Sequence, residues 1–140
     1  LIWYAGKAKL LIDTGPGSST NFEKAKAQFE DLDAILYTHL HADHSSALPG
    51  FIKGSYFTSR DSDLMVFGPN GNKLLPAIDD FLVRMFGSDG IYPYLADMLS
   101  STEDSSSFKL IPIVVSHKAD TAFATKLNKN IQIIIILTII

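Results

Sequence analysis

The sequence contains no cysteine. A disulfide framework, a thiolate zinc site, a thiol nucleophile and a redox pair are therefore excluded, so histidine and carboxylate must hold any metal ion. Positive charge is also scarce, because 12 Lys and Arg face 15 Asp and Glu and the net charge is −3. The composition lacks the basic excess that nucleic-acid binding normally needs, and it leaves a nucleic-acid partner unsupported.

A membrane-spanning run and a recognisable chain start are missing as well. The uncharged stretch 131–140 is too short to cross a bilayer, which takes about 20 residues, so no membrane partner is predicted. The chain begins at Leu1 without an initiator methionine or the charged start of a signal peptide. We expect the N-terminus to be missing. A cytoplasmic location is the default, and export stays open because the missing part could carry a signal peptide.

Apolar side chains, in contrast, are abundant. They make up 46% of the 140 residues and include nine Phe and five Tyr, enough for a packed core. Strand-like runs alternate with helix-like segments, which is typical of a layered α/β (α+β) domain with a largely buried sheet. The stretch 131–140 is either a buried strand or an anomalous apolar tail that favours aggregation.

Element boundaries follow from apolar spacing and from Gly and Pro positions. The predicted strands are 1–4, 9–13, 32–38, 64–67, 108–115 and 121–127, and the predicted helices are 21–30, 47–52 and 72–86. The first two strands are expected to form a hairpin with a four-residue loop. Thr20 and Glu23 have the spacing of a capping box for the first helix, and residues 68–71 form a predicted turn.

One cluster of residues is a candidate metal-binding site. His39-Leu40-His41-Ala42-Asp43-His44 follows a predicted strand and holds three of the four histidines. In extended backbone, residues two apart point to the same side, so His39 and His41 can bind one ion. Asp43 and His44 are offset and would serve a neighbouring ion. These ligands suit zinc or another divalent ion, and two ions sharing a water can generate hydroxide at neutral pH. A solvent-exposed, histidine-rich turn is the alternative.

The motif has a family resemblance. Together with Leu10-Leu11-Ile12-Asp13-Thr14-Gly15, the segment 38–44 (THLHADH) resembles the metallo-β-lactamase superfamily of metallohydrolases. Residues 15–17 and 67–71 are most similar to its ribonuclease Z and arylsulfatase-like branch, although the Gly-Pro-Gly turn departs from true tRNA-processing members. The resemblance covers 1–127 and implies a partial αββα metallo-β-lactamase sandwich, of which this chain would supply the N-terminal half.

The resemblance also implies residue roles. His39, His41 and His117 would hold the first ion. Asp43 and His44 would hold part of the second, with Asp43 also orienting or deprotonating the bridging water as the catalytic group. Without the resemblance, His117 would be interpreted as a packed residue at a strand end. Zinc is the expected metal, two ions in the family, and manganese or iron would suit the same ligands.

Asp13 stands at the end of the second predicted strand. The resemblance implies that its carboxylate steadies the ligand loop through hydrogen bonds. An Asx-turn over Thr14 and Gly15 is the alternative, and the two roles are compatible.

The family pattern is incomplete in this chain. It requires a further Asp that bridges the two ions and a final His, and neither type occurs after Asp120, which is too close to His117 to be the bridging residue. We therefore expect one well-ligated site and an incomplete second one. Residues 1–140 are predicted to form a single incomplete domain whose sheet lacks the partner layer on one face.

The leading functional hypothesis is a metal-dependent hydrolase that uses a zinc-activated water on a phospho-, sulfo- or carboxylic ester. This fragment would be inactive if its incomplete second site cannot support the reaction. One alternative is a ribonuclease Z-like tRNA 3′-end endonuclease, which would need a basic surface or an added RNA-binding arm. Another is a non-catalytic remnant that binds one metal ion or none. The expected partner is a small-molecule or phosphodiester substrate, and a homo-oligomer could supply missing ligands.

Overall fold

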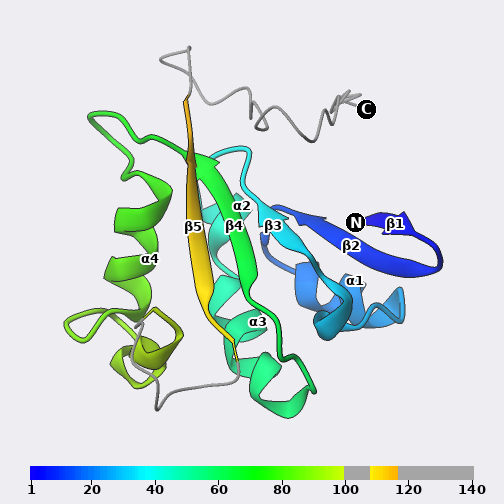
Figure 1. Ribbon diagram of the computed structural model, residues 1–140. Helices are drawn as coiled ribbons and strands as arrows, with labels where there is room; N and C mark the ends of the chain where they lie inside the picture. Colours follow the sequence, from blue (N-terminus) through cyan, green and yellow to red (C-terminus); the bar gives the residue numbers. More distant parts are fainter. Residues whose placement is uncertain (100–107, 117–140) are drawn as a thin grey trace.

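The computed structural model describes residues 1–99 and 108–116, which form one mixed sheet with helices (Figure 1). The strands are β1 (Ile2–Tyr4), β2 (Lys7–Ile12), β3 (Ala34–Leu36), β4 (Leu64–Pro69) and β5 (Leu110–Val115). The α-helices are α1 (Ser18–Lys24), α2 (Ala42–Ser45), α3 (Leu48–Gly54) and α4 (Ile78–Phe86), and short 3-10 helices are η1 (Phe29–Asp31), η2 (Ser55–Phe57) and η3 (Pro93–Met98). The predicted α/β class is confirmed. His117, the predicted strand 121–127 and the stretch 131–140 lie outside the described residues.

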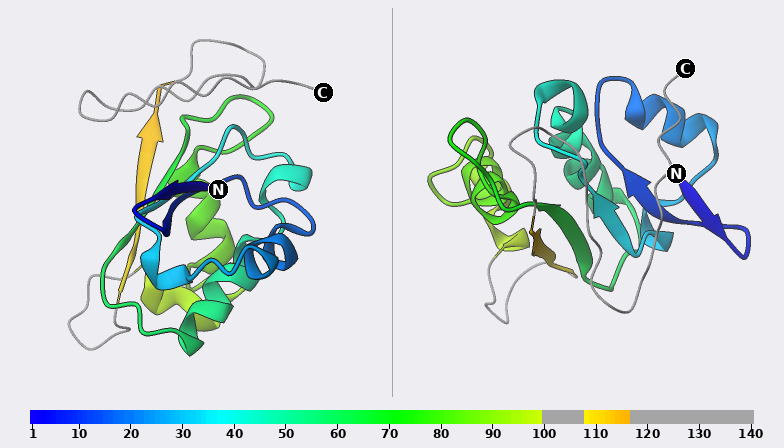
Figure 2. Two further views of the ribbon diagram at one scale, coloured as in Figure 1. Left: turned by 90° about the vertical axis from the view of Figure 1, so that its right-hand side faces the viewer. Right: turned by 90° about the horizontal axis from the view of Figure 1, so that it is seen from above.

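The strands lie in the order β1-β2-β3-β4-β5, which is also their order in the chain. β1 pairs with β2 in antiparallel fashion, and every other neighbouring pair is parallel. Right-handed crossovers between successive parallel strands carry the connecting helices to the same face. Figures 1 and 2 show this arrangement, with α1, α3 and α4 on one side of the sheet.

Each face of the sheet has its own apolar cluster, because side chains alternate along a strand. Leu11, Ile35 and Val66 lie side by side in register and face the helices as part of the main core. The opposite face carries a smaller cluster of Ala34, Leu36, Phe67 and Val115 with the half-buried Leu10, Ile12, Met65 and Ile113. Among residues 1–99 and 108–116, no helix packs on that second face (Figure 2). β3 is buried throughout, as its apolar run predicted.

The N-terminal hairpin is tighter than predicted. Tyr4 pairs with Lys7, so the loop has two residues rather than four. Ala5 has φ +49° and Gly6 has φ +78°, the pair of positive values that a type I′ turn requires. This turn matches the twist of paired strands, and β2 consequently starts two residues earlier than position 9.

The first helix lies earlier than predicted. α1 begins directly after Gly17, whose φ is +79°, and no side-chain cap is formed there, so the predicted capping box is wrong. The helix ends where Lys26 adopts a φ of +57°. The amide of Lys26 donates to the carbonyl of Glu23 and that of Ala27 to the carbonyl of Phe22, which is a Schellman ending.

The helix predicted at 72–86 is shorter at its start. α4 begins at Ile78, and Leu74 is 92% exposed. Pro76 explains the difference, because proline disfavours helical backbone in the preceding residue and has no amide hydrogen to donate. The side chain of Asn72 accepts hydrogen bonds from the amides of Leu74 and Leu75 and organises the segment as a turn.

The predicted turn at 68–71 is partly strand, because β4 continues through Gly68 to Pro69. A β-carbon on Gly68 would lie 2.7 Å from the β-carbon of Ile78, the first residue of α4. Glycine at this position therefore permits close packing of helix against strand.

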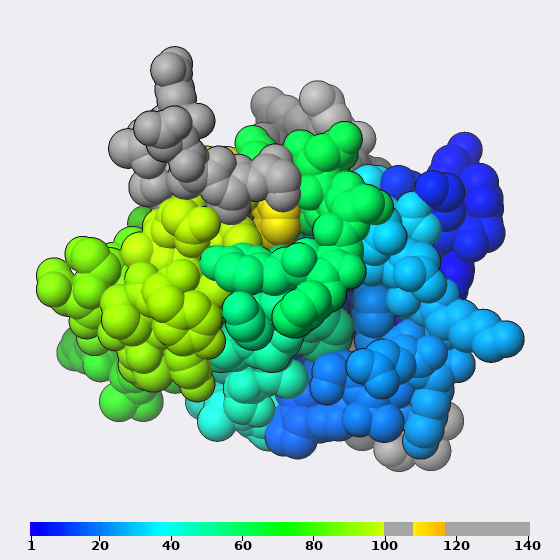
Figure 3. Space-filling view, turned by 90° about the horizontal axis from the view of Figure 1, so that it is seen from below, coloured from blue at the N-terminus to red at the C-terminus, as the bar shows by residue number. Residues whose placement is uncertain are grey.

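At the lower end of the helical layer, α3 lies between η3 and α1 (Figure 3). Near this end, the ammonium group of Lys53 lies 4.2 Å from the ring centre of Tyr56 and 5.7 Å from that of Tyr94. Among the described residues, no helix is both long and apolar enough to span a membrane.

Candidate metal centre

The site lies at the edge of the sheet where the parallel strands end. Ile12 and Leu36, the last residues of β2 and β3, are paired in register. The amide of Asp13 donates to the carbonyl of Leu36 at 2.8 Å and continues the ladder one step further. Because parallel strands finish at the same edge, Asp13 and the segment starting at Thr38 become neighbours.

The histidine-rich motif itself is a short loop followed by a helix. His41 precedes α2, and the amides of His44 and Ser45 donate to its carbonyl at 2.9 and 3.1 Å. The Ser45 hydroxyl donates to the same carbonyl at 3.0 Å. These bonds fix the turn of backbone that separates His41 from Asp43 and His44.

The loop after β2 is tied to this helix. The amide of Thr14 donates to the carbonyl of His44 at 2.7 Å, and the carbonyl of Thr14 accepts from the amide of Ala47 at 2.8 Å. The buried hydroxyl groups of Thr14 and Tyr37 lie 2.6 Å apart. Gly15 is pressed against the same helix, because a β-carbon there would overlap the carbonyl oxygen of Asp43. The loop after β2 therefore packs against helix α2 and supports the motif.

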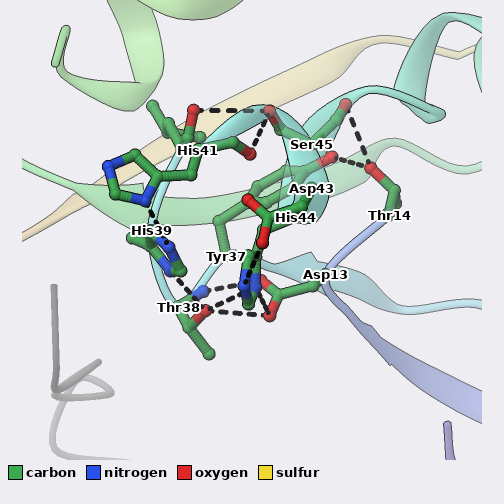
Figure 4. Close-up of polar contacts among 10 residues, drawn as sticks. Asp13, Thr14, Tyr37, Thr38, His39, His41, Asp43, His44 and Ser45 are labelled. Carbon is green, nitrogen blue, oxygen red and sulfur yellow. Dashed lines mark hydrogen bonds and ion pairs between the residues drawn. The ribbon is translucent and has the colours of Figure 1, made fainter. Parts of the chain in front are cut away.

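Three side chains converge on one point. His39, His41 and Asp43 each offer a ligand atom, and these atoms all lie within 4.8 Å of one another. Nε2 of His39 and Nδ1 of His41 are 3.1 Å apart (Figure 4). His39 is buried, whereas His41 and Asp43 are exposed. The group can hold a metal ion, since imidazole nitrogen and carboxylate oxygen are common zinc ligands.

A second set of contacts lies beneath these ligands. The carboxylate of Asp13 accepts from the amide of Thr38 at 2.8 Å through Oδ1. Its Oδ2 accepts from the Thr38 hydroxyl at 2.8 Å and lies 2.8 Å from Nδ1 of His44. Asp13 adopts a φ of +55°, in the left-handed region that Asp tolerates better than most residues. One carboxylate thus connects β2 to the start and to the end of the motif.

Burial sets the charge state of the innermost ligand. It lowers the pKa of His39, and the neighbouring His44 and His41 lower it further. The charges of Asp13 and Asp43 oppose this shift. The net effect favours the neutral imidazole, which is the form that binds a metal ion.

The grouping differs in one respect from the sequence prediction. Asp43 was expected to serve a second ion with His44, but its carboxylate lies within reach of His39 and His41. It also lies 3.6 Å from Nε2 of His44, so Asp43 stands between the two histidine sets. The predicted ligand His117 is outside the described residues, and the ligand roles remain predictions.

Sequence reasoning missed the supporting residues. Tyr37 was assigned only to a buried strand, and Thr38 was assigned to that strand and to the motif, but neither side chain was given a role. The Thr38 side chain bonds to Asp13, and that of Tyr37 bonds to Thr14. The available signal was a Thr immediately before the histidine-rich motif and an Asp at the end of the preceding predicted strand. Gly15 was recognised as part of a turn, but its contact with Asp43 was not expected.

A mixed sheet whose parallel strands place histidine and carboxylate side chains at their carboxyl edge defines an α/β domain with a candidate metal site. Residues 1–59 match the family model described as the Metallo-beta-lactamase superfamily. The match covers the segment that holds the motif, so the resemblance drawn from the motif is confirmed over residues 1–59.

Curated relatives share the name Ribonuclease Z. The protein of Ignicoccus hospitalis is 36% identical over 83 residues, which are 59% of this chain and 26% of that protein. Those of Clostridium perfringens and Porphyromonas gingivalis are 31% and 34% identical, covering 74% and 77% of this chain and 30% and 36% of their own lengths. The chain therefore spans about a quarter to a third of these relatives, which support the ribonuclease Z side of the predicted branch.

Proposed function

We propose that this chain carries the histidine-rich metal site of a hydrolase that cleaves ester-type bonds, with phosphodiesters of RNA as the favoured substrate class. The observation that carries the proposal is the convergence of ligand atoms from His39, His41 and Asp43 within 4.8 Å. The name shared by the relatives supports the choice of RNA. Cleavage at the 3′ end of tRNA precursors is the narrower form of the proposal.

The donor set fits zinc, with manganese or iron as metals that accept the same ligands. A bound divalent ion would supply a water that ionises near neutral pH. His39 and His41 would hold this ion, and Asp43 would orient the water and accept its proton from an exposed position. Asp13 would keep the loop in place by its hydrogen bonds to Thr38 and to His44.

Further ligands are required for a complete centre. β5 ends at Val115, which pairs with Pro69 at the same edge of the sheet, and His117 follows two residues later. This register supports His117 as the third ligand of the first ion. His44 would contribute to a second ion, whose remaining ligands would lie outside residues 1–140.

Hydrolysis of chromogenic model esters tests the proposal. With zinc or manganese added, we expect turnover of bis(p-nitrophenyl) phosphate, and we expect His41→Ala to abolish it. Parallel assays with p-nitrophenyl sulfate and p-nitrophenyl acetate compare the other ester classes. A tRNA precursor with a 3′ trailer tests the narrower form. If the protein binds metal but hydrolyses none of these substrates, the non-catalytic remnant is the better description.

A further inference from the structure

The hydroxyl of Thr38 lies at the centre of the contacts beneath the site. It is 2.8 Å from Oδ2 of Asp13 and 3.1 Å from Nδ1 of His39 (Figure 4). The amide of Thr38 independently donates to Oδ1 of Asp13. Thr38 therefore makes two hydrogen bonds to Asp13. Of the two groups involved, only the hydroxyl also contacts His39.

The available hydrogens define the direction of each bond. An ionised carboxylate can only accept, so the single hydroxyl hydrogen of Thr38 is donated to Asp13. The hydroxyl oxygen can then only accept from His39, which requires the proton of that ring to sit on Nδ1. The other nitrogen, Nε2, is left with a free lone pair, and it is the atom 3.1 Å from Nδ1 of His41.

The same carboxylate acts directly on His44. Oδ2 of Asp13 lies 2.8 Å from Nδ1 of His44, so that ring also carries a proton on Nδ1. Its Nε2 faces Asp43 at 3.6 Å. Asp13 therefore orients His44 itself, but it reaches His39 only through the Thr38 hydroxyl.

We propose that Thr38 is a positioning residue. Its hydroxyl links the Asp13 carboxylate to His39 through two hydrogen bonds and holds this ring in the tautomer whose Nε2 is free for a metal ion. The inference rests on the proposed metal site. It adds that a side chain outside the ligand set determines which nitrogen of the buried ligand is available. Free imidazole exchanges between both tautomers, so fixing one lowers the cost of binding.

Two variants separate the role of the hydroxyl from that of packing. Thr38→Val keeps the shape and the backbone bond to Asp13 but removes the hydroxyl, whereas Thr38→Ser keeps the hydroxyl. Ring nitrogen-15 NMR of the chelator-treated protein at mildly alkaline pH reports the tautomer of each histidine, with His39→Gln to assign the signals. Zinc affinity is measured separately by competition with a chromogenic chelator.

In the wild type and in Thr38→Ser, we expect His39 to be protonated on Nδ1. In Thr38→Val, we expect a mixture of tautomers for His39, an unchanged tautomer for His44, and zinc binding weakened by about 10-fold to 100-fold. A wild-type His39 protonated on Nε2 would overturn the proposal, even if Thr38→Val does not fold. So would equal tautomers and affinities in all three proteins, or a failure of Thr38→Ser to restore binding.

The two proposals can fail separately. If the wild type does not bind zinc, the metal site is wrong, whereas the tautomer measurement on metal-free protein still decides the role of Thr38. If zinc binds and the tautomer is insensitive to Thr38→Val, only the inference about Thr38 is wrong.

Discussion

Gly15 and Asp43 are in direct backbone contact, 28 positions apart in the sequence: a β-carbon on Gly15 would occupy the space of the Asp43 carbonyl oxygen. This contact joins the loop after β2 to the helix that carries the predicted ligands. Since the carbonyl belongs to helix α2, it cannot move without displacing the helix that also holds His44.

Replacing Gly15 by alanine should therefore disrupt the metal site. The added methyl must displace α2, so we expect Gly15→Ala to destabilise the fold by about 1–3 kcal/mol and to weaken zinc binding. Gly50→Ala is the matched control, because a β-carbon there meets nothing within 4 Å and lies in helix α3. Chemical denaturation and zinc titration should leave that variant at least as stable as the wild type. Equal behaviour of both variants would argue against the contact.

Loss of the Asp13 carboxylate should weaken metal binding more than it disturbs the backbone conformation. Asn tolerates the left-handed conformation at this position and keeps the size of the side chain, but it carries no charge and only one acceptor oxygen. We expect Asp13→Asn to weaken zinc binding by about 10-fold to 100-fold, as measured by chelator competition. Asp13→Gly relieves the backbone strain and should still bind zinc poorly. Wild-type affinity in both variants would contradict the assigned role.

Tyr37 should make the fold sensitive to alkali. Burial raises the pKa of its phenol, the hydrogen bond with Thr14 lowers it, and the charge of Asp13 raises it; the net shift is upward. The unfolded chain loses this proton near pH 10 while the fold keeps it, so the folded state loses stability as the pH rises above about 10.

Tyr37→Phe cannot ionise, so its free energy of unfolding should fall less steeply between about pH 9 and pH 11 than that of the wild type. At neutral pH the variant should be less stable by about 1 kcal/mol, because the hydrogen bond to Thr14 is lost. Urea denaturation at a series of pH values checks both effects. Parallel curves would show that Tyr37 does not titrate as described.

Arg60 should contribute strongly to stability despite its charge. It is 3% exposed, and its guanidinium group donates to the carbonyls of Phe29, Leu32 and Asp63 at 3.2, 2.6 and 2.7 Å. Methionine would leave three acceptors without this donor, so we expect Arg60→Met to cost about 2 kcal/mol or more. Arg84→Met removes an exposed arginine paired with Asp80 and should destabilise the protein much less, because solvent screens an exposed ion pair. Thermal unfolding of the two variants gives the comparison.

The ligand cluster could be predicted from sequence because its signal is local. Histidines two positions apart after a buried run identify both the edge of the sheet and the chemistry, and His39 and His41 indeed face each other. The supporting contacts are not local. Asp13 meets Thr38 across 25 positions, and only the strand register reveals that pairing.

Errors in the predicted elements also have physical causes. Apolar periodicity extended the last predicted helix back to position 72, but Pro76 and the side chain of Asn72 impose a turn there. The capping-box spacing at Thr20 was overruled by Gly17, whose positive φ starts the helix earlier. In both cases a local constraint at one or two residues outweighed a pattern spread over several.

Metal content per chain is the most direct test of the central claim that the site formed by His39, His41 and Asp43 holds a divalent ion. The protein would be loaded with zinc, desalted and analysed by elemental mass spectrometry beside His39→Ala, with circular dichroism to check that both are folded. We predict about one zinc per wild-type chain and almost none in His39→Ala. About two per chain, lost in the variant, would indicate that a second subunit completes the other site. Equal zinc in both proteins, or none in either, would contradict the account.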